Sequence, residues 1–184
     1  MDKPLRIDVG CGENLRPGYV GCDIRQYLAW TPYVCRAWEL SEHVDPGTVD
    51  EIYSRHMLEH LTFKEGEAAL RDWYKCLKPY GKIEVIVPNV ITHINQFLDG
   101  ENGTIKNSES DRTMLLTRGA SGIWGWQRQG NPETDEWDER HGDVHKSGYT
   151  TSTLKGMLSH VGYQHVSVDT SLLHVTAVGF KIGE

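Results

Sequence analysis

The sequence predicts an α/β protein with a mostly parallel sheet, and two observations carry that prediction. Short apolar runs rich in β-branched residues end at glycine or at a turn, as buried strands do. Segments with apolar side chains at helical spacing alternate with these runs. Strands that alternate with helices form parallel sheets with both faces covered, so we expect helices on both faces. The length of 184 residues fits a single domain.

Four predicted strands occupy the first third of the chain. Each is short and apolar and lies next to a glycine, a proline or a polar turn; they span residues 5–9, 19–24, 33–37 and 49–54. Residues 63–77 then place their apolar side chains on one face of a predicted helix, and Pro79-Tyr80-Gly81 is expected to end it. The fifth strand, residues 82–88, has the clearest strand pattern in the sequence.

The second half of the chain is predicted to add two helices and two strands. The first helix spans residues 90–98, and the second begins at Thr151 or Ser152 and runs to residue 161. Residues 164–169 and 172–181 are predicted strands. Because only a few residues join these two strands, they must be antiparallel to one another.

Residues 99–150 are expected to form a lid or insertion within one domain that spans residues 1–184. They are poor in aliphatic side chains, but they contain half of the tryptophans, which a solvated linker rarely carries. These residues are Trp124, Trp126 and Trp137. The acidic block at residues 133–143 is interpreted as the solvated edge of this lid.

Composition and charge exclude several classes of protein. The formal net charge of −7 disfavours a nucleic-acid partner, which needs a basic surface. No apolar run approaches the roughly 20 residues that span a bilayer, and the first residues lack the apolar core of a signal peptide. The four cysteines have no Cys-x-x-Cys spacing, so reduced thiols in a cytoplasmic protein are expected.

Two features at the ends of the first two strands predict a nucleoside site. Asp8-Val9-Gly10-Cys11-Gly12 lies where the first strand ends, and glycines there let the backbone approach a ligand closely. The nicotinamide fingerprint requires a third glycine where this chain has Leu15. Asp23 ends the second strand, and a carboxylate there can accept both hydroxyl groups of a ribose.

Four blocks of sequence together resemble the class I S-adenosylmethionine-dependent methyltransferases, in particular a group of small type 11-like members. The blocks are residues 7–12, Asp23, residues 50–60 and residues 77–83, and their order and spacing match the family over residues 5–89. The resemblance implies a Rossmann-like, seven-stranded, mostly parallel sheet whose last strand is antiparallel. It also implies S-adenosylmethionine as the cofactor and methyl transfer to an oxygen or nitrogen of a small acceptor, such as a sugar or a metabolite.

The resemblance further implies a cofactor site at the ends of the first four strands. The methionine end would be held by Asp8, Gly10 and Gly12, and the ribose by Asp23. The adenine would lie near Glu39 and Leu40. The methionine side would be lined by Ser54, Arg55 and His56. One departure concerns the connection over residues 12–19. It is shorter than the roughly dozen residues that a crossover helix needs, so this side of the cofactor is expected to be less covered.

The segment from His141 to Tyr149 supplies the candidate general base. A hydroxyl or amine acceptor loses a proton during methyl transfer, and histidine titrates in the useful range. His145 is the first candidate, with His141 and Tyr149 behind it. The alternative is a surface loop whose histidines are merely solvated.

Two alternatives come from other classes of function. His56-Met57-Leu58-Glu59-His60 matches a zinc-peptidase pattern in which two histidines one helical turn apart bind the metal. The preferred interpretation assigns no metal, because this segment coincides with the Leu-Glu-His segment of the methyltransferases. The second alternative is a module that binds S-adenosylmethionine without turnover.

Overall fold

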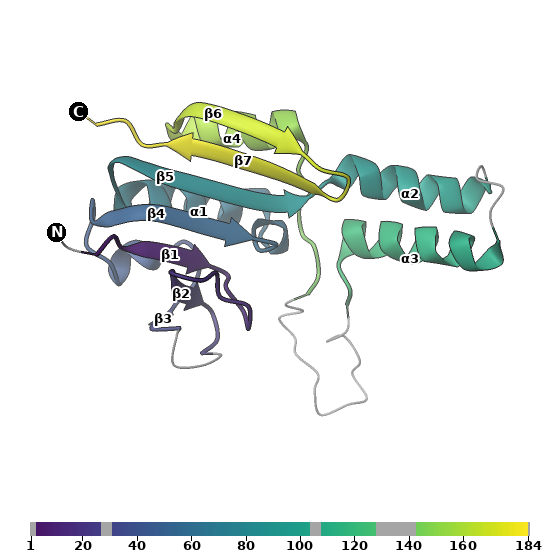
Figure 1. Cartoon of the computed structure of the whole chain (residues 1–184), viewed down its shortest axis with the longest axis horizontal. Helices are drawn as coiled ribbons and strands as arrows, with labels where there is room; N and C mark the ends of the chain where they lie inside the picture. Colours follow the sequence, from purple (N-terminus) through teal and green to yellow (C-terminus); the bar gives the residue numbers. More distant parts are fainter. Residues whose placement is uncertain (1–2, 27–30, 104–107, 128–142, 184) are drawn as a thin grey trace.

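The computed structural model describes residues 3–26, 31–103, 108–127 and 143–183, and its centre is one seven-stranded sheet (Figure 1). The strands lie in the order β3-β2-β1-β4-β5-β7-β6. The first five pair in parallel, whereas β7 is antiparallel to both β5 and β6. The predicted mostly parallel sheet with an antiparallel closing pair is confirmed. The strands are β1 (Arg6–Val9), β2 (Val20–Asp23), β3 (Tyr33–Val34), β4 (Val49–Arg55), β5 (Leu77–Pro88), β6 (Gln164–Thr170) and β7 (His174–Phe180).

Two helices cover one face of this sheet: α1 (Phe63–Cys76) and α4 (Thr151–Val161). Both begin at a threonine whose side chain accepts a backbone N–H, and both bury an apolar stripe against the strands. A single-turn 3₁₀ helix, η1 (Leu40–Glu42), packs beside α1. Figure 1 shows α1 and α4 on the same side of the sheet, and the Tyr163 hydroxyl after α4 donates to the Leu70 carbonyl of α1 at 3.0 Å.

The expected helices on the second face are not present among the residues that the structure describes. The connection from β1 to β2 contains only turns, since its length does not allow a crossover helix. Polar and aromatic side chains fill part of this face instead. The Arg16 guanidinium lies 4.1 Å from the centre of the Tyr53 ring and 3.3 Å from Glu84, and Lys82 pairs with Glu51 and Glu84.

The helix α1 ends earlier than the predicted helix, and β5 begins earlier than its prediction. Leu77 has extended backbone and is the first residue of β5, so Pro79-Tyr80-Gly81 lies inside the strand. Tyr80 has a φ of +64°, which marks a local irregularity in that strand. The helix is therefore ended by strand pairing rather than by a Pro-Gly turn.

Two further helices, α2 (Val90–Asn102) and α3 (Glu109–Trp124), form a hairpin beyond the carboxyl ends of β4 and β5 (Figure 1). Small residues let the two helices approach closely, because a Cβ at Gly119 would lie 2.6 Å from the backbone nitrogen of Phe97. Helix α3 lies in the segment expected to form a lid. Trp137 and most of the acidic block fall outside the described residues. No helix in the described part of the chain has the length and apolar character needed to span a bilayer.

Candidate cofactor and acceptor site

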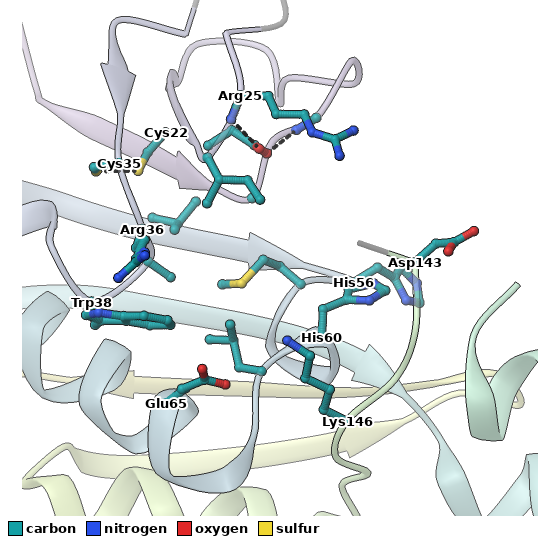
Figure 2. A pocket seen from close by; sticks show the side chains of 18 residues that line it. Cys22, Arg25, Cys35, Arg36, Trp38, His56, His60, Glu65, Asp143 and Lys146 are labelled. Carbon is teal, nitrogen blue, oxygen red and sulfur yellow. Dashed lines mark hydrogen bonds between the residues drawn. The ribbon is translucent and has the colours of Figure 1, made fainter. Parts of the chain in front are cut away.

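A cavity of about 600 Å³ opens at the carboxyl ends of β1, β2 and β4. This edge of a parallel sheet is where open α/β folds bind ligands. Figure 2 shows Arg36 and Trp38 at one end of the cavity and His56, His60 and Lys146 at the other. The lining residues are Val9, Gly10, Gly12, Cys22, Asp23, Ile24, Arg25, Cys35, Arg36, Ala37, Trp38, His56, Met57, His60, Leu61, Glu65, Asp143 and Lys146.

The turn after β1 has a backbone that only glycine adopts without strain. Gly10 and Gly12 have φ values of +75° and +51°. A Cβ at Gly10 would overlap the side chain of Met57, whereas the corresponding position at Gly12 has no atom within 4 Å. The Gly10 N–H donates to the Cys22 carbonyl at 2.8 Å, which ties the turn to β2. Both predicted glycines line the cavity. A side chain at Gly10 would overlap Met57, whereas Gly12 is required only by its backbone conformation.

The Asp23 carboxylate lies at the end of β2 and lines the cavity. Its Oδ2 accepts the Gly12 N–H at 3.0 Å, and its Oδ1 accepts the Arg25 N–H at 3.3 Å (Figure 2). Each carboxylate oxygen can accept more than one hydrogen bond, so both keep the capacity to accept a hydroxyl of a ligand. Asp23 thus holds the glycine turn in place and presents acceptors to the cavity.

Five of the predicted cofactor residues do not line the cavity, and three of these five belong to β1 and β4. Asp8 is buried, and its Oδ2 accepts the Arg16 N–H at 2.9 Å, so the carboxylate fixes the loop after the glycine turn. Burial raises the pKa of Asp8 above its ordinary value. Ser54 is buried in β4, and Arg55, the last residue of that strand, is exposed. None of the three is among the residues that line the cavity.

At the end of the cavity near β3, the lining residues come just before Glu39 and Leu40, the pair predicted to lie near the adenine. Glu39 lies outside the lining, and its carboxylate accepts the Arg36 N–H at 3.0 Å. Leu40 is fully buried in the core as the first residue of η1. Ala37 and Trp38 line the cavity instead. Neither residue was predicted from the sequence. A signal that could have found them is Trp38, an aromatic side chain four residues after the end of β3.

The segment from His56 to His60, which matches the zinc-peptidase pattern, does not form the α-helix that this pattern requires. His56 follows β4 with a φ of +52°, and only the single-turn 3₁₀ helix η2 (Leu58–His60) follows it. The two histidines are therefore not one turn apart on an α-helix, as the peptidase pattern requires. Both line the cavity. His56 Nδ1 lies 3.2 Å from Oε1 of Glu59, whose side chain is buried.

The candidate bases occupy different environments. His145 is half-buried beside His60, with the ring centres 5.0 Å apart, and burial lowers its pKa below the ordinary value. Its imidazole is therefore neutral at pH 7. Tyr149 is 1% exposed and packs edge-on against Phe63 in the core, outside the cavity lining. His141 lies outside the described residues.

No protein-family model and no curated protein matches the sequence. The fold, in contrast, is that of the class I S-adenosylmethionine-dependent methyltransferases. A methyltransferase of this kind from Methanosarcina mazei matches with a TM-score of 0.61 at 14% identity, over 100% of this chain and 95% of that one. Another, from Archaeoglobus fulgidus, matches with a TM-score of 0.59 at 14% identity, over 97% and 86%.

A third solved structure is phosphoethanolamine N-methyltransferase 2 from Haemonchus contortus in complex with S-adenosyl-L-methionine. It matches with a TM-score of 0.57 at 12% identity, over 100% of this chain, and this chain spans half of its length. At these identities the likeness defines the fold of the chain.

Proposed function

We propose that this protein is an S-adenosylmethionine-dependent methyltransferase that methylates an oxygen or nitrogen of a small acceptor, such as a sugar or a metabolite. The observation that carries the proposal is the cavity at the carboxyl ends of β1, β2 and β4. There a left-handed glycine turn is hydrogen-bonded to the carboxylate of Asp23. Four free thiols, all buried, support a reducing, cytoplasmic environment.

The cavity fits S-adenosylmethionine in size and in chemistry. Its volume of about 600 Å³ falls in the range of small-molecule pockets. Asp23 would accept the ribose hydroxyls, and Ala37 and Trp38 would provide an apolar wall for the adenine. The backbone at Gly10 and Gly12 would lie along the methionine end. When bound, the cofactor supplies a methyl group that its positive sulfur makes open to attack.

The opposite end of the cavity would take the acceptor. Methyl transfer is an in-line displacement. The residues that line this end of the cavity would therefore mainly align the acceptor and receive its proton. His60 lines the cavity and its Nδ1 lies 3.1 Å from the Val144 carbonyl, so Nε2 carries the lone pair. His145, the predicted base, packs edge-on against the His60 ring. We propose this imidazole pair as the proton acceptor.

Calorimetric titration of metal-stripped protein with S-adenosylmethionine and S-adenosylhomocysteine tests the cofactor assignment. Micromolar binding of both is expected. Absence of binding at millimolar ligand would overturn the proposal. A screen of acceptors, beginning with sugars and following S-adenosylhomocysteine formation, then tests turnover. Binding without turnover across a broad panel would favour the module that only binds the cofactor.

Asp23→Ala is expected to weaken S-adenosylhomocysteine binding by about 1–3 kcal/mol, because the ribose loses its acceptor and the Gly12 N–H loses its partner. Asp169→Ala is the matched control, since Asp169 is exposed on β6 at the opposite edge of the sheet. An affinity equal to that of the control would show that the ribose is not held at β2.

A further inference from the structure

A carboxylate and two imidazoles lie close together behind the end of the cavity that His60 lines. Glu59 and His60 belong to η2, and His145 comes from the segment that precedes α4. One potential ligand atom from each of the three side chains lies within 4.8 Å of those of the other two. Ligands on one zinc ion lie roughly 3.4 Å apart, so a small contraction of the three side chains is enough to enclose an ion.

The two histidines are held in the form that binds a metal. His60 Nδ1 lies 3.1 Å from the Val144 carbonyl oxygen, and His145 Nδ1 lies 3.1 Å from the Gly122 carbonyl oxygen. A carbonyl only accepts, so each Nδ1 carries the hydrogen and each Nε2 keeps its lone pair. Metal-binding histidines are oriented in this way by a partner on the second ring nitrogen.

Glu59 gives a second, independent indication of a cation. Its side chain is only 1% exposed, and Oε2 has no hydrogen-bond partner among the described residues. Its other oxygen, Oε1, is 3.2 Å from His56 Nδ1, which orients the carboxylate. A buried carboxylate oxygen without a partner costs free energy, and a metal ion bound by this oxygen and the two imidazoles would remove that cost.

We propose that Glu59, His60 and His145 bind one first-row divalent transition-metal ion, with Zn²⁺ as the probe. Two imidazoles and one carboxylate suit such an ion better than Mg²⁺ or Ca²⁺, which prefer oxygen ligands alone. Three protein ligands leave coordination positions open, as in catalytic zinc sites. Because His60 lines the cavity, an ion held by its imidazole would lie next to the space assigned to the acceptor.

The role of this metal in methyl transfer rests on the proposed function, whereas its binding does not. In the metal-bound protein both imidazoles are ligands, so they no longer receive the proton of the acceptor. An acceptor hydroxyl on the ion would have a lowered pKa and would release its proton to water before methyl transfer. The site would then select acceptors with a hydroxyl group that can reach the ion.

Titration of metal-stripped protein with Zn²⁺, followed by calorimetry and elemental analysis, tests the site. One equivalent is expected. Glu59→Gln and His145→Ala are each expected to weaken binding by more than about 100-fold, because loss of a second-shell partner alone costs 10–100-fold. His43→Ala is the control, since His43 is exposed and lies outside this group. Circular dichroism confirms that each variant folds.

Binding of Co²⁺ in place of Zn²⁺ distinguishes metal binding at this site from metal binding by the cysteines. Nitrogen and oxygen ligands are expected to give visible d–d bands without thiolate charge-transfer bands. Failure of Zn²⁺ to bind, equal binding to Glu59→Gln and the wild type, or thiolate bands would each overturn the proposed site. S-Adenosylhomocysteine binding is measured on the same samples. Metal binding without it would contradict only the proposed function, and the reverse result would contradict only the metal site.

Discussion

Trp73→Ala is expected to lower the free energy of unfolding by about 3–5 kcal/mol, the cost of emptying a large site in a packed core. Trp73 is fully buried in α1, and its indole N–H donates to the Ala37 carbonyl at 2.7 Å. Ala37 lines the cavity, so this side chain also fixes the wall assigned to the adenine. Urea unfolding followed by circular dichroism measures the effect.

Two further substitutions help to interpret the loss of stability in Trp73→Ala: one isolates the hydrogen bond of the indole, and the other is a control at an exposed tryptophan. Trp73→Phe keeps an aromatic ring but leaves the Ala37 carbonyl without its donor, so a loss of about 1–3 kcal/mol is expected. Trp126→Ala removes a tryptophan that is 58% exposed and is expected to cost less than about 1 kcal/mol. Equal losses for Trp73→Ala and Trp126→Ala would contradict the assigned core.

Gly10→Ala is expected to destabilise the protein by about 2–5 kcal/mol and to abolish S-adenosylhomocysteine binding. A left-handed backbone costs a non-glycine residue about 1–2 kcal/mol, and overpacking adds about 1–3 kcal/mol. At Gly10 both apply, because φ is +75° and the new Cβ would overlap Met57. Thermal unfolding and calorimetric titration measure the two outcomes.

Gly12→Ala is the control for the steric part of this prediction. Gly12 also has a positive φ, +51°, but its Cβ position is open. Only the backbone cost of about 1–2 kcal/mol is therefore expected. If the two alanine variants were equally stable, the close contact between the glycine turn and Met57 would be wrong.

Much of the fold could be predicted because its signals are local. Each strand and the helices α1, α2 and α4 follow from apolar periodicity and from residues that begin or end an element. Gly10, Gly12, Asp23 and His56, which were predicted to bind the cofactor, line the cavity, since residues at the carboxyl ends of parallel strands meet at one edge of a sheet. Helix α3 was not distinguished within the expected lid, because its apolar pattern is weak and Gly119 and Gly122 interrupt it.

Some predicted site residues lie away from the cavity, at places where the course of the chain depends on distant partners. Leu40 enters the core because η1 packs against α1, which leaves Ala37 and Trp38 at the cavity. Tyr149 is buried in the core beside α1. Gly66 of α1 leaves room for the Tyr149 hydroxyl, because a Cβ at this position would lie 2.9 Å from the hydroxyl oxygen. Local sequence does not encode these packing choices.

The class of sheet, the glycine turn and the aspartate at the end of β2 follow from the local sequence, because each depends on backbone preference or on alternation along one strand. The packing of the whole chain, in contrast, sets which face of the sheet has no helix among the described residues. It also decided that His145 meets Glu59 and His60, because η2 and the segment before α4 are far apart in sequence. Close packing of distant segments is what creates these contacts, and it follows from burial of the whole core rather than from any local pattern.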